Sequence, residues 1–141
     1  MAAEGRIPLC LLLLRVGVFI VMLVWTLDKF LHPDHAAQVY AFFYAIGGMG
    51  ATVLYVIGAL ELLLILAFLA GLLRRVTYGA VLLLHAGSTL AAWRQYLDPF
   101  ENLLFFAAWP VLAACVTLYL LRDLDTLGVV PARRSAPNLR A

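Results

Sequence analysis

Residues 53–73 read VLYVIGALELLLILAFLAGLL, and this stretch decides the fold of the chain. It contains 21 residues and a single charge, Glu61, near its middle. At a rise of about 1.5 Å per residue, a helix of about 20 apolar residues crosses the roughly 30 Å hydrocarbon core of a bilayer. A carboxylate in that core is costly, so it usually faces other helices and has a partner. The stretch therefore predicts a membrane-spanning helix with a buried charge.

The composition of the whole chain is typical of a membrane protein. Of its 141 residues, 65% are hydrophobic and 13% are charged, whereas soluble domains are about 45–50% apolar and about 25% charged. This excludes an ordinary soluble domain and also a disordered chain. The net charge of +2 is too small to indicate a nucleic-acid partner. Cys10 and Cys115 form no CxxC pair, so both are interpreted as buried apolar residues.

Four apolar segments with short connections predict an all-α fold, a bundle of four transmembrane helices. In this interpretation residues 1–128 form one membrane domain, and residues 129–141 form a polar cytoplasmic tail. Pro110 predicts a kink in the last span, because proline removes a helical hydrogen-bond donor. The expected spans are residues 7–27, 51–73, 76–93 and 102–121.

The connection between the first two spans contains residues 32–50, HPDHAAQVYAFFYAIGGMG. Pro33 and Asp34 are typical of a helix start, and the glycines at 47, 48 and 50 indicate a stop. The aromatic residues between them suit the depth of lipid headgroups. We therefore expect a short helix lying in the membrane interface, with a re-entrant hairpin as the alternative.

The basic residues give the expected orientation, because cytoplasmic loops are enriched in Lys and Arg. With both termini in the cytoplasm, only Lys29 and Arg94 lie on the outer side. The inner side then holds seven arginines: Arg6, Arg74, Arg75, Arg122, Arg133, Arg134 and Arg140.

Three titratable residues, Arg15, Glu61 and His85, are predicted to meet near the middle of the membrane. Counted from the arginines that mark the inner surface, they lie about 13, 19 and 15 Å deep at helical rise. Ser88 and Thr89 lie one turn after His85, so their hydroxyls can bond its imidazole. One interpretation is an Arg–Glu ion pair that fixes the helices in register. The other is a proton or quinone site, in which His85 titrates near neutral pH.

A second polar cluster is expected at the outer surface. It is interpreted either as an aromatic belt with exposed ion pairs, which contribute little each, or as a headgroup or ligand entrance above the buried triad. His32 and His35 flank Asp34, but this is a weak metal pattern, so no metal site is predicted. The cluster consists of Trp25, Asp28, Lys29, Trp93, Arg94 and Asp98, with Tyr96 beside them.

Several of these residues together resemble the DoxX-like family of small four-helix membrane proteins. The resemblance is carried by Arg15, by Lys29 in the DKF motif, and by GALELLLILAFLAGLLRR, which contains Glu61 and Gly71. It covers roughly residues 9–121. Where that family has a glycine-containing stretch before the lysine, this chain has WTLDKF.

The resemblance implies a bacterial inner-membrane subunit linked to redox chemistry, since relatives include the membrane part of thiosulfate:quinone oxidoreductase. The expected function is binding of a quinone or similar lipid-soluble ligand near Arg15, Glu61 and His85, within a membrane redox complex. Expected partners are lipids and another membrane or redox protein, or a second copy of the chain.

No haem, flavin or iron–sulfur pattern occurs in the sequence, so no covalently bound cofactor is expected. Quinone or a partner protein would have to carry any electrons, and whether the chain is an enzyme stays open. The alternative function is a non-catalytic scaffold or assembly subunit, in which the buried ion pair is structural.

Overall fold

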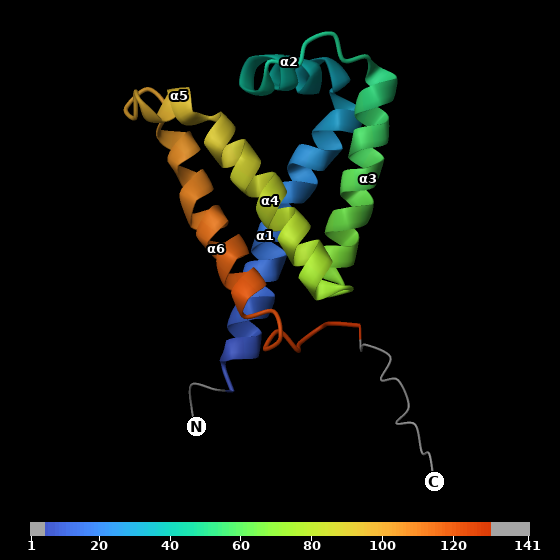
Figure 1. Cartoon of the computed structure of the whole chain (residues 1–141), viewed down its shortest axis with the longest axis vertical. Helices are drawn as coiled ribbons and strands as arrows, with labels where there is room; N and C mark the ends of the chain where they lie inside the picture. Colours follow the sequence, from blue (N-terminus) through green and yellow to red (C-terminus); the bar gives the residue numbers. More distant parts are fainter. Residues whose placement is uncertain (1–4, 131–141) are drawn as a thin grey trace.

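The computed structural model describes residues 5–130, which form a bundle of helices (Figure 1). All secondary structure in this range is helical, so the predicted all-α class is confirmed. In chain order the elements are α1 (Ile7–Leu31), α2 (Pro33–Tyr44), α3 (Ala51–Leu69), α4 (Arg74–Ala91), α5 (Trp93–Tyr96), the 3-10 helix η1 (Leu103–Ala107) and α6 (Ala108–Leu120).

Three helical segments are long and apolar enough to cross a membrane: Ile7–Leu31, Ala51–Leu69 and Leu103–Leu120, the last joining η1 to α6. Three of the four expected spans are thus confirmed as helices of spanning length and apolarity. The remaining one corresponds to α4, which is also 18 residues long. Its mean hydropathy is lowered by polar residues, and four of these lie on its buried face: Thr77, Tyr78, His85 and Thr89.

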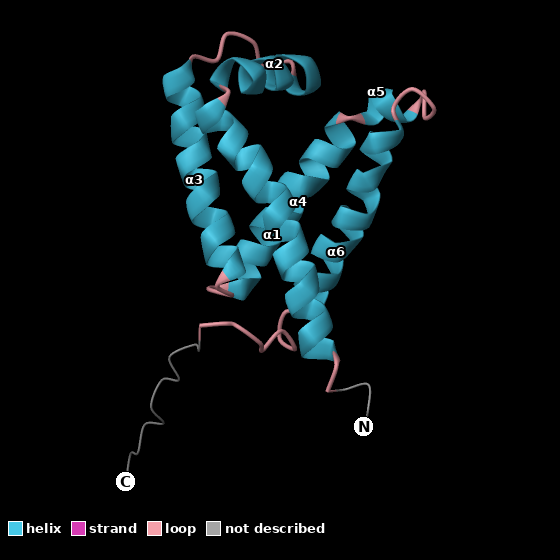
Figure 2. Cartoon of the chain, turned by 180° about the vertical axis from the view of Figure 1, so that it is seen from behind, coloured by secondary structure: helices cyan, strands magenta, loops and turns pink. Residues whose placement is uncertain are grey.

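Two helix pairs form the body of the bundle. α1 packs along α3 and α4 packs along α6, with further contacts between α1 and α6 and between α3 and α4. The pairs lie together at the end where the described chain begins and finishes, and they diverge toward the end occupied by α2 and α5 (Figures 1 and 2). We call these the basic end, which carries Arg6, Arg74, Arg75 and Arg122, and the splayed end.

The core lies where the two helix pairs meet. Phe68 of α3 packs edge-on against Tyr78 of α4, with 4.9 Å between ring centroids. Cys115 belongs to this core, but Cys10 is exposed, which corrects the prediction that both cysteines are buried. The buried members are Leu11, Val18, Met22, Ile65, Phe68, Tyr78, Val81, Cys115 and Leu118.

The first helix extends further than predicted, to Leu31 instead of residue 27. Lys29 is therefore part of a continuous helix and not of a surface break. Pro33 explains the end of α1, because proline disfavours the helical conformation in the residue before it; His32 has φ −136° and ψ 61°. α2 then begins at Pro33, as predicted, and Ala45 ends it in the left-handed conformation.

The second predicted span is shorter than expected, since α3 ends at Leu69 and not at residue 73. Gly71 (φ +65°) and Leu73 (φ +44°) form a tight left-handed turn into α4. Pro110 lies close to the point where the segment Leu103–Leu120 changes from the 3-10 helix η1 to α6, and the kink expected at this proline stays a prediction. Pro110 is the third residue of α6, after η1, and in the first helical turn its missing N–H has no helical acceptor to lose.

Residues 121–130 follow α6 and return across the basic end of the bundle; we call them the C-terminal strap. The strap is not helical, but it is docked: the Val130 N–H donates to the Ala70 carbonyl at 2.9 Å. Val129 lies against Gly71, where a Cβ atom would overlap it. Packing therefore continues two residues into the predicted tail, and residues 131–141 lie outside the described residues.

Candidate functional site

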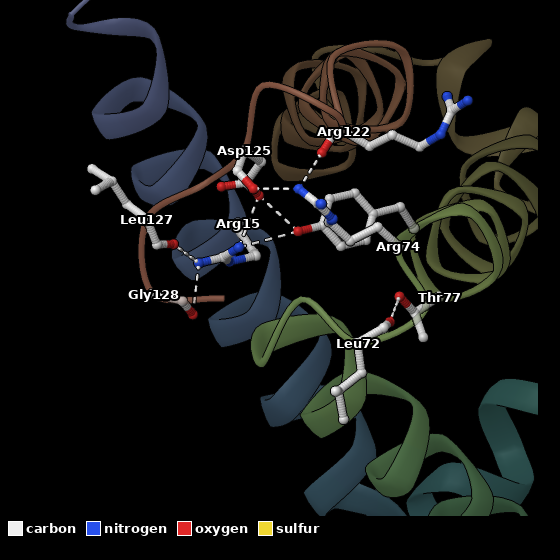
Figure 3. Close-up of polar contacts among 9 residues, drawn as sticks. Arg15, Leu72, Arg74, Thr77, Arg122, Asp125, Leu127 and Gly128 are labelled. Carbon is white, nitrogen blue, oxygen red and sulfur yellow. Dashed lines mark hydrogen bonds and ion pairs between the residues drawn. The ribbon is translucent and has the colours of Figure 1, made fainter. Parts of the chain in front are cut away.

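Arg15 is completely buried, and its guanidinium joins α1 to α4 and to the strap (Figure 3). Nη1 donates to the Asp125 carboxylate at 2.9 Å and to the Tyr78 hydroxyl at 3.1 Å. Nη2 donates to the carbonyls of Leu127 at 2.5 Å and Gly128 at 3.2 Å. The Tyr78 hydroxyl in turn donates to Asp125 at 2.7 Å. We call this set the inner clasp.

A second arginine fastens the same strap from the start of α4. Arg74 Nη1 donates to the carbonyls of Arg122 at 2.8 Å and Asp125 at 2.5 Å (Figure 3). Gly128 has φ +61°, and a Cβ there would lie 3.4 Å from Arg15 Nη2. The strap thus satisfies guanidinium donors largely with main-chain carbonyls, which an irregular segment leaves free.

Two polar atoms of the inner clasp, Arg15 Nε and Asp125 Oδ1, are buried without a hydrogen-bond partner among the described residues. The clasp is therefore neutral in charge but not saturated in hydrogen bonds. Breaking one side of such a buried pair costs about 3–5 kcal/mol, because it strands the remaining charge. This geometry favours a role in holding the segments together.

Glu61 pairs with Lys29 and not with Arg15. Lys29 Nζ lies 2.7 Å from Glu61 Oε2, and the two side chains are only 9% and 14% exposed. Nζ also donates to the Trp25 carbonyl at 3.1 Å. Gly58 permits this approach of α1 to α3, since a Cβ there would meet the Phe30 ring at 2.9 Å. We call this pair the outer pair.

Two phenols of α2, Tyr40 and Tyr44, lie within the electrostatic range of Glu61. Burial, and then the negative charge of Glu61, raise the pKa of Tyr40 above its ordinary value of 10.0, with a smaller contribution from Tyr44. Burial and Glu61 likewise raise the pKa of Tyr44. Both phenols are therefore protonated at physiological pH, and their helix, α2, packs against the two helices that carry the outer pair.

His85 belongs to neither ion pair. Its Nε2 lies 3.1 Å from the Ala108 carbonyl, at the start of α6. Ser88 and Thr89 donate to the main-chain carbonyl of His85, at 2.9 and 2.8 Å, and not to its imidazole as predicted. This pattern joins α4 to α6 and satisfies buried polar groups locally.

The predicted convergence of Arg15, Glu61 and His85 is therefore wrong. The depth estimate took Arg6 as the membrane surface, but α1 extends past the turn between α3 and α4. Arg15 consequently lies level with that turn, since its Nη1 would be 3.4 Å from a Cβ at Gly71. Glu61 is level with Lys29, which lies fourteen residues, or about 21 Å, further along α1.

The predicted outer cluster divides into separate contacts. Lys29 turns inward to Glu61, and Asp28 pairs with His35 Nδ1 at 2.8 Å. On α5, the Arg94 guanidinium lies over the Trp93 ring, 5.4 Å from its centroid. The main-chain carbonyl of Asp98 accepts from Asn102 at 2.9 Å. Trp25 and Trp93 are exposed.

The sequence interpretation missed Asp125, Tyr78 and the strap carbonyls, which complete the inner clasp. Asp125 follows the last span in the run RDLDTLG, where a surface acid is the usual expectation. The available signal was Arg15 itself, because a buried arginine requires an acidic partner. Searches for similar proteins found no matching protein-family model, no matching curated protein and no matching solved structure.

Proposed function

We propose that the chain is a four-span membrane protein that serves as a non-catalytic scaffold or assembly subunit of a membrane complex. The observation that carries this proposal is that Arg15 and Lys29, the lysine and arginine side chains that are buried within residues 5–130, lie within 2.9 Å of a carboxylate from another segment. Each ion pair joins two segments that are distant in the sequence, so the charges stabilise contacts within the chain. Ion pairs of this kind fix which segments meet.

The contacts of α4 support its role as the fourth span. Its 18 residues correspond to about 27 Å, close to the thickness of the hydrocarbon core. Four of its polar residues, Thr77, Tyr78, His85 and Thr89, are buried in the bundle, whereas its exposed large residues are Val76, Leu83, Leu84 and Leu90. Polar groups directed inward with apolar groups outward are the arrangement expected in lipid.

The splayed end supports an interfacial position for α2. This helix lies crosswise at the upper end of α1, level with the top of α3 (Figure 1), and its Phe42 and Tyr44 are 66% and 40% exposed. The connection between α5 and α6 also exposes large apolar side chains, since Phe100 and Leu104 are 85% and 89% exposed. Such side chains suit contact with lipid or with a neighbouring membrane protein.

The scaffold role can be tested with the tagged full-length chain in native membranes. After extraction in mild detergent, native electrophoresis should show it in a band larger than the monomer. The paired neutral variants Arg15→Leu/Asp125→Leu and Lys29→Leu/Glu61→Leu, where folded, should remain in that band. Migration of the wild-type chain alone would contradict the proposal.

A second candidate function is binding of a quinone or similar lipid-soluble ligand, which the resemblance to DoxX-like proteins favours. The observation in its support is that the helix of Tyr40 and Tyr44, α2, packs against both α1 and α3, which carry the outer pair, because lysine and phenol donors suit quinone carbonyls. The excess of basic residues at one end favours both termini in the cytoplasm of a bacterial inner membrane.

Thermal unfolding tests this candidate. A short-chain quinone should raise the unfolding temperature of the wild type, and Lys29→Met should abolish the effect. The matched control is Arg94→Met, which removes an exposed cation at the same end. If the quinone leaves the wild type unchanged, the candidate is rejected.

A further inference from the structure

We propose that an apolar groove at the basic end holds one anionic phospholipid of the adjoining leaflet. The groove lies between the start of α1 and the end of α6 and has a volume of about 450 Å³. It opens on the surface, because Cys10 and Leu121 are exposed. The groove is lined by Arg6, which precedes α1, by Ile7, Cys10, Leu11 and Leu14 of α1, and by Thr117 and Leu121 from α6 and its end.

The length and chemistry of the groove suit an acyl chain. From Arg6 to Leu14 is eight residues, or about 12 Å along the helix, which is close to half the hydrocarbon thickness of a bilayer. The Thr117 hydroxyl does not make the wall polar, because it donates to the Ala113 carbonyl at 2.8 Å. What remains along the groove is almost entirely hydrocarbon surface.

Arg6 gives the groove a charged end. It is exposed, and its guanidinium has no hydrogen-bond or ion-pair partner within residues 5–130. A cation at one end of an apolar groove complements a lipid with a phosphate headgroup and a hydrocarbon tail. Basic residues next to a membrane attract anionic lipids, each contributing about fivefold in affinity.

A second pocket, next to the groove, explains why we place the phospholipid on the side of Arg6. It has a volume of about 480 Å³ and shares Ile7 with the groove. Its wall includes Asp123 and Thr126, so an anionic headgroup there would meet a carboxylate. Charge complementarity therefore assigns the phospholipid to the groove beside Arg6.

The test is native mass spectrometry of the full-length chain released from nanodiscs of equal phosphatidylglycerol and phosphatidylcholine. The wild type should retain one phosphatidylglycerol about fivefold more often than phosphatidylcholine. Arg6→Gln should abolish the preference. The matched control is Arg75→Gln, since Arg75 is an exposed basic residue at the same end but does not line the groove. This variant should keep the preference for phosphatidylglycerol. Thr117→Trp should fill the groove and reduce retention of both lipids.

Equal retention of the two lipids by the wild type would overturn the inference. So would an Arg6→Gln variant that behaves like Arg75→Gln, or a Thr117→Trp variant that instead disrupts a dimer of this chain. Helix content by circular dichroism shows that each variant is folded. The lipid inference requires that the protein lies in a membrane, but it does not require the scaffold function. A chain that migrates as a monomer in native electrophoresis but prefers phosphatidylglycerol would therefore contradict only the scaffold proposal.

Discussion

The guanidinium of Arg15 lies 2.9 Å from the carboxylate of Asp125, a residue 110 positions further along the chain. This pair joins the first helix to the strap that follows the last one. Because both side chains are fully buried, neither charge has water as an alternative partner. The Arg15 charge is therefore neutralised only when the strap is docked on the bundle.

Replacement of Asp125 should be strongly destabilising. Asp125→Ala leaves the Arg15 charge buried, and we expect a loss of about 3–5 kcal/mol in the free energy of unfolding. Unfolding in mixed micelles with increasing SDS measures this quantity. The control is Asp123→Ala, an exposed acid two residues earlier, which should change stability by less than about 0.5 kcal/mol. Equal effects of the two variants would show that the inner clasp does not stabilise the bundle.

Gly71 should tolerate no side chain. Its φ of +65° strains any L residue, and a Cβ would overlap Val129 of the strap. We expect Gly71→Ala to cost at least about 2 kcal/mol and to speed hydrogen exchange at the Val130 amide. Gly87→Ala is the control, because that position is helical with open space around it, and it should be neutral or slightly stabilising. Unchanged exchange at Val130 in Gly71→Ala would mean that the strap does not depend on this turn.

The outer pair should respond to charge exchange. Lys29→Glu places two carboxylates together in a largely buried position and should destabilise the α1–α3 contact by several kcal/mol. Adding Glu61→Lys restores opposite charges, so the double variant should recover part of the loss. Arg94→Glu is the matched control at the splayed end and should not be rescued by Glu61→Lys. Independent, additive effects at residues 29 and 61 would argue against the pair.

The phenols beside Glu61 should ionise at high pH. Since folding raises the pKa of Tyr40 and Tyr44 above 10.0, their contribution to stability is complete below pH 10 and is lost as pH rises through the raised values. Glu61→Gln should lower both values but leave them above 10.0, because burial is the larger cause. NMR of tyrosine labelled at the ζ carbon follows each titration, with Tyr→Phe variants for assignment. Unchanged pKa values of Tyr40 and Tyr44 in Glu61→Gln, or an equal decrease of these pKa values in Glu101→Gln, would contradict a role of the Glu61 charge.

The helices could be predicted from local patterns, but the partners of the buried charges could not. The apolar runs predict the helices, and Pro33 predicts the start of α2. Both features depend only on residues that are close in sequence. The need of Arg15 and Glu61 for partners also follows from the cost of charge in lipid. The identity of those partners depends on the height of α1 relative to α3. Arg15 lies nine residues, or about two and a half turns, after Arg6, yet it is level with the turn that follows α3.

The docking of the strap could not be predicted from the sequence for a different reason. Residues 121–130, LRDLDTLGVV, mix charged and apolar residues without a long apolar run, and Leu127 and Gly128 contribute only main-chain carbonyls to Arg15. A carbonyl carries no side-chain pattern that sequence reasoning can recognise. The sequence likewise predicts a surface position for Lys29, because a DKF run after an apolar segment is typical of a helix end.

The most direct test of the two-pair arrangement is a double-mutant cycle on the free energy of unfolding, with Arg15→Leu combined in turn with Asp125→Leu and Glu61→Leu. We predict a coupling energy of at least about 1 kcal/mol between Arg15 and Asp125, and additivity within about 0.5 kcal/mol between Arg15 and Glu61. Strong coupling of Arg15 to Glu61, with additive behaviour toward Asp125, would contradict the arrangement described above.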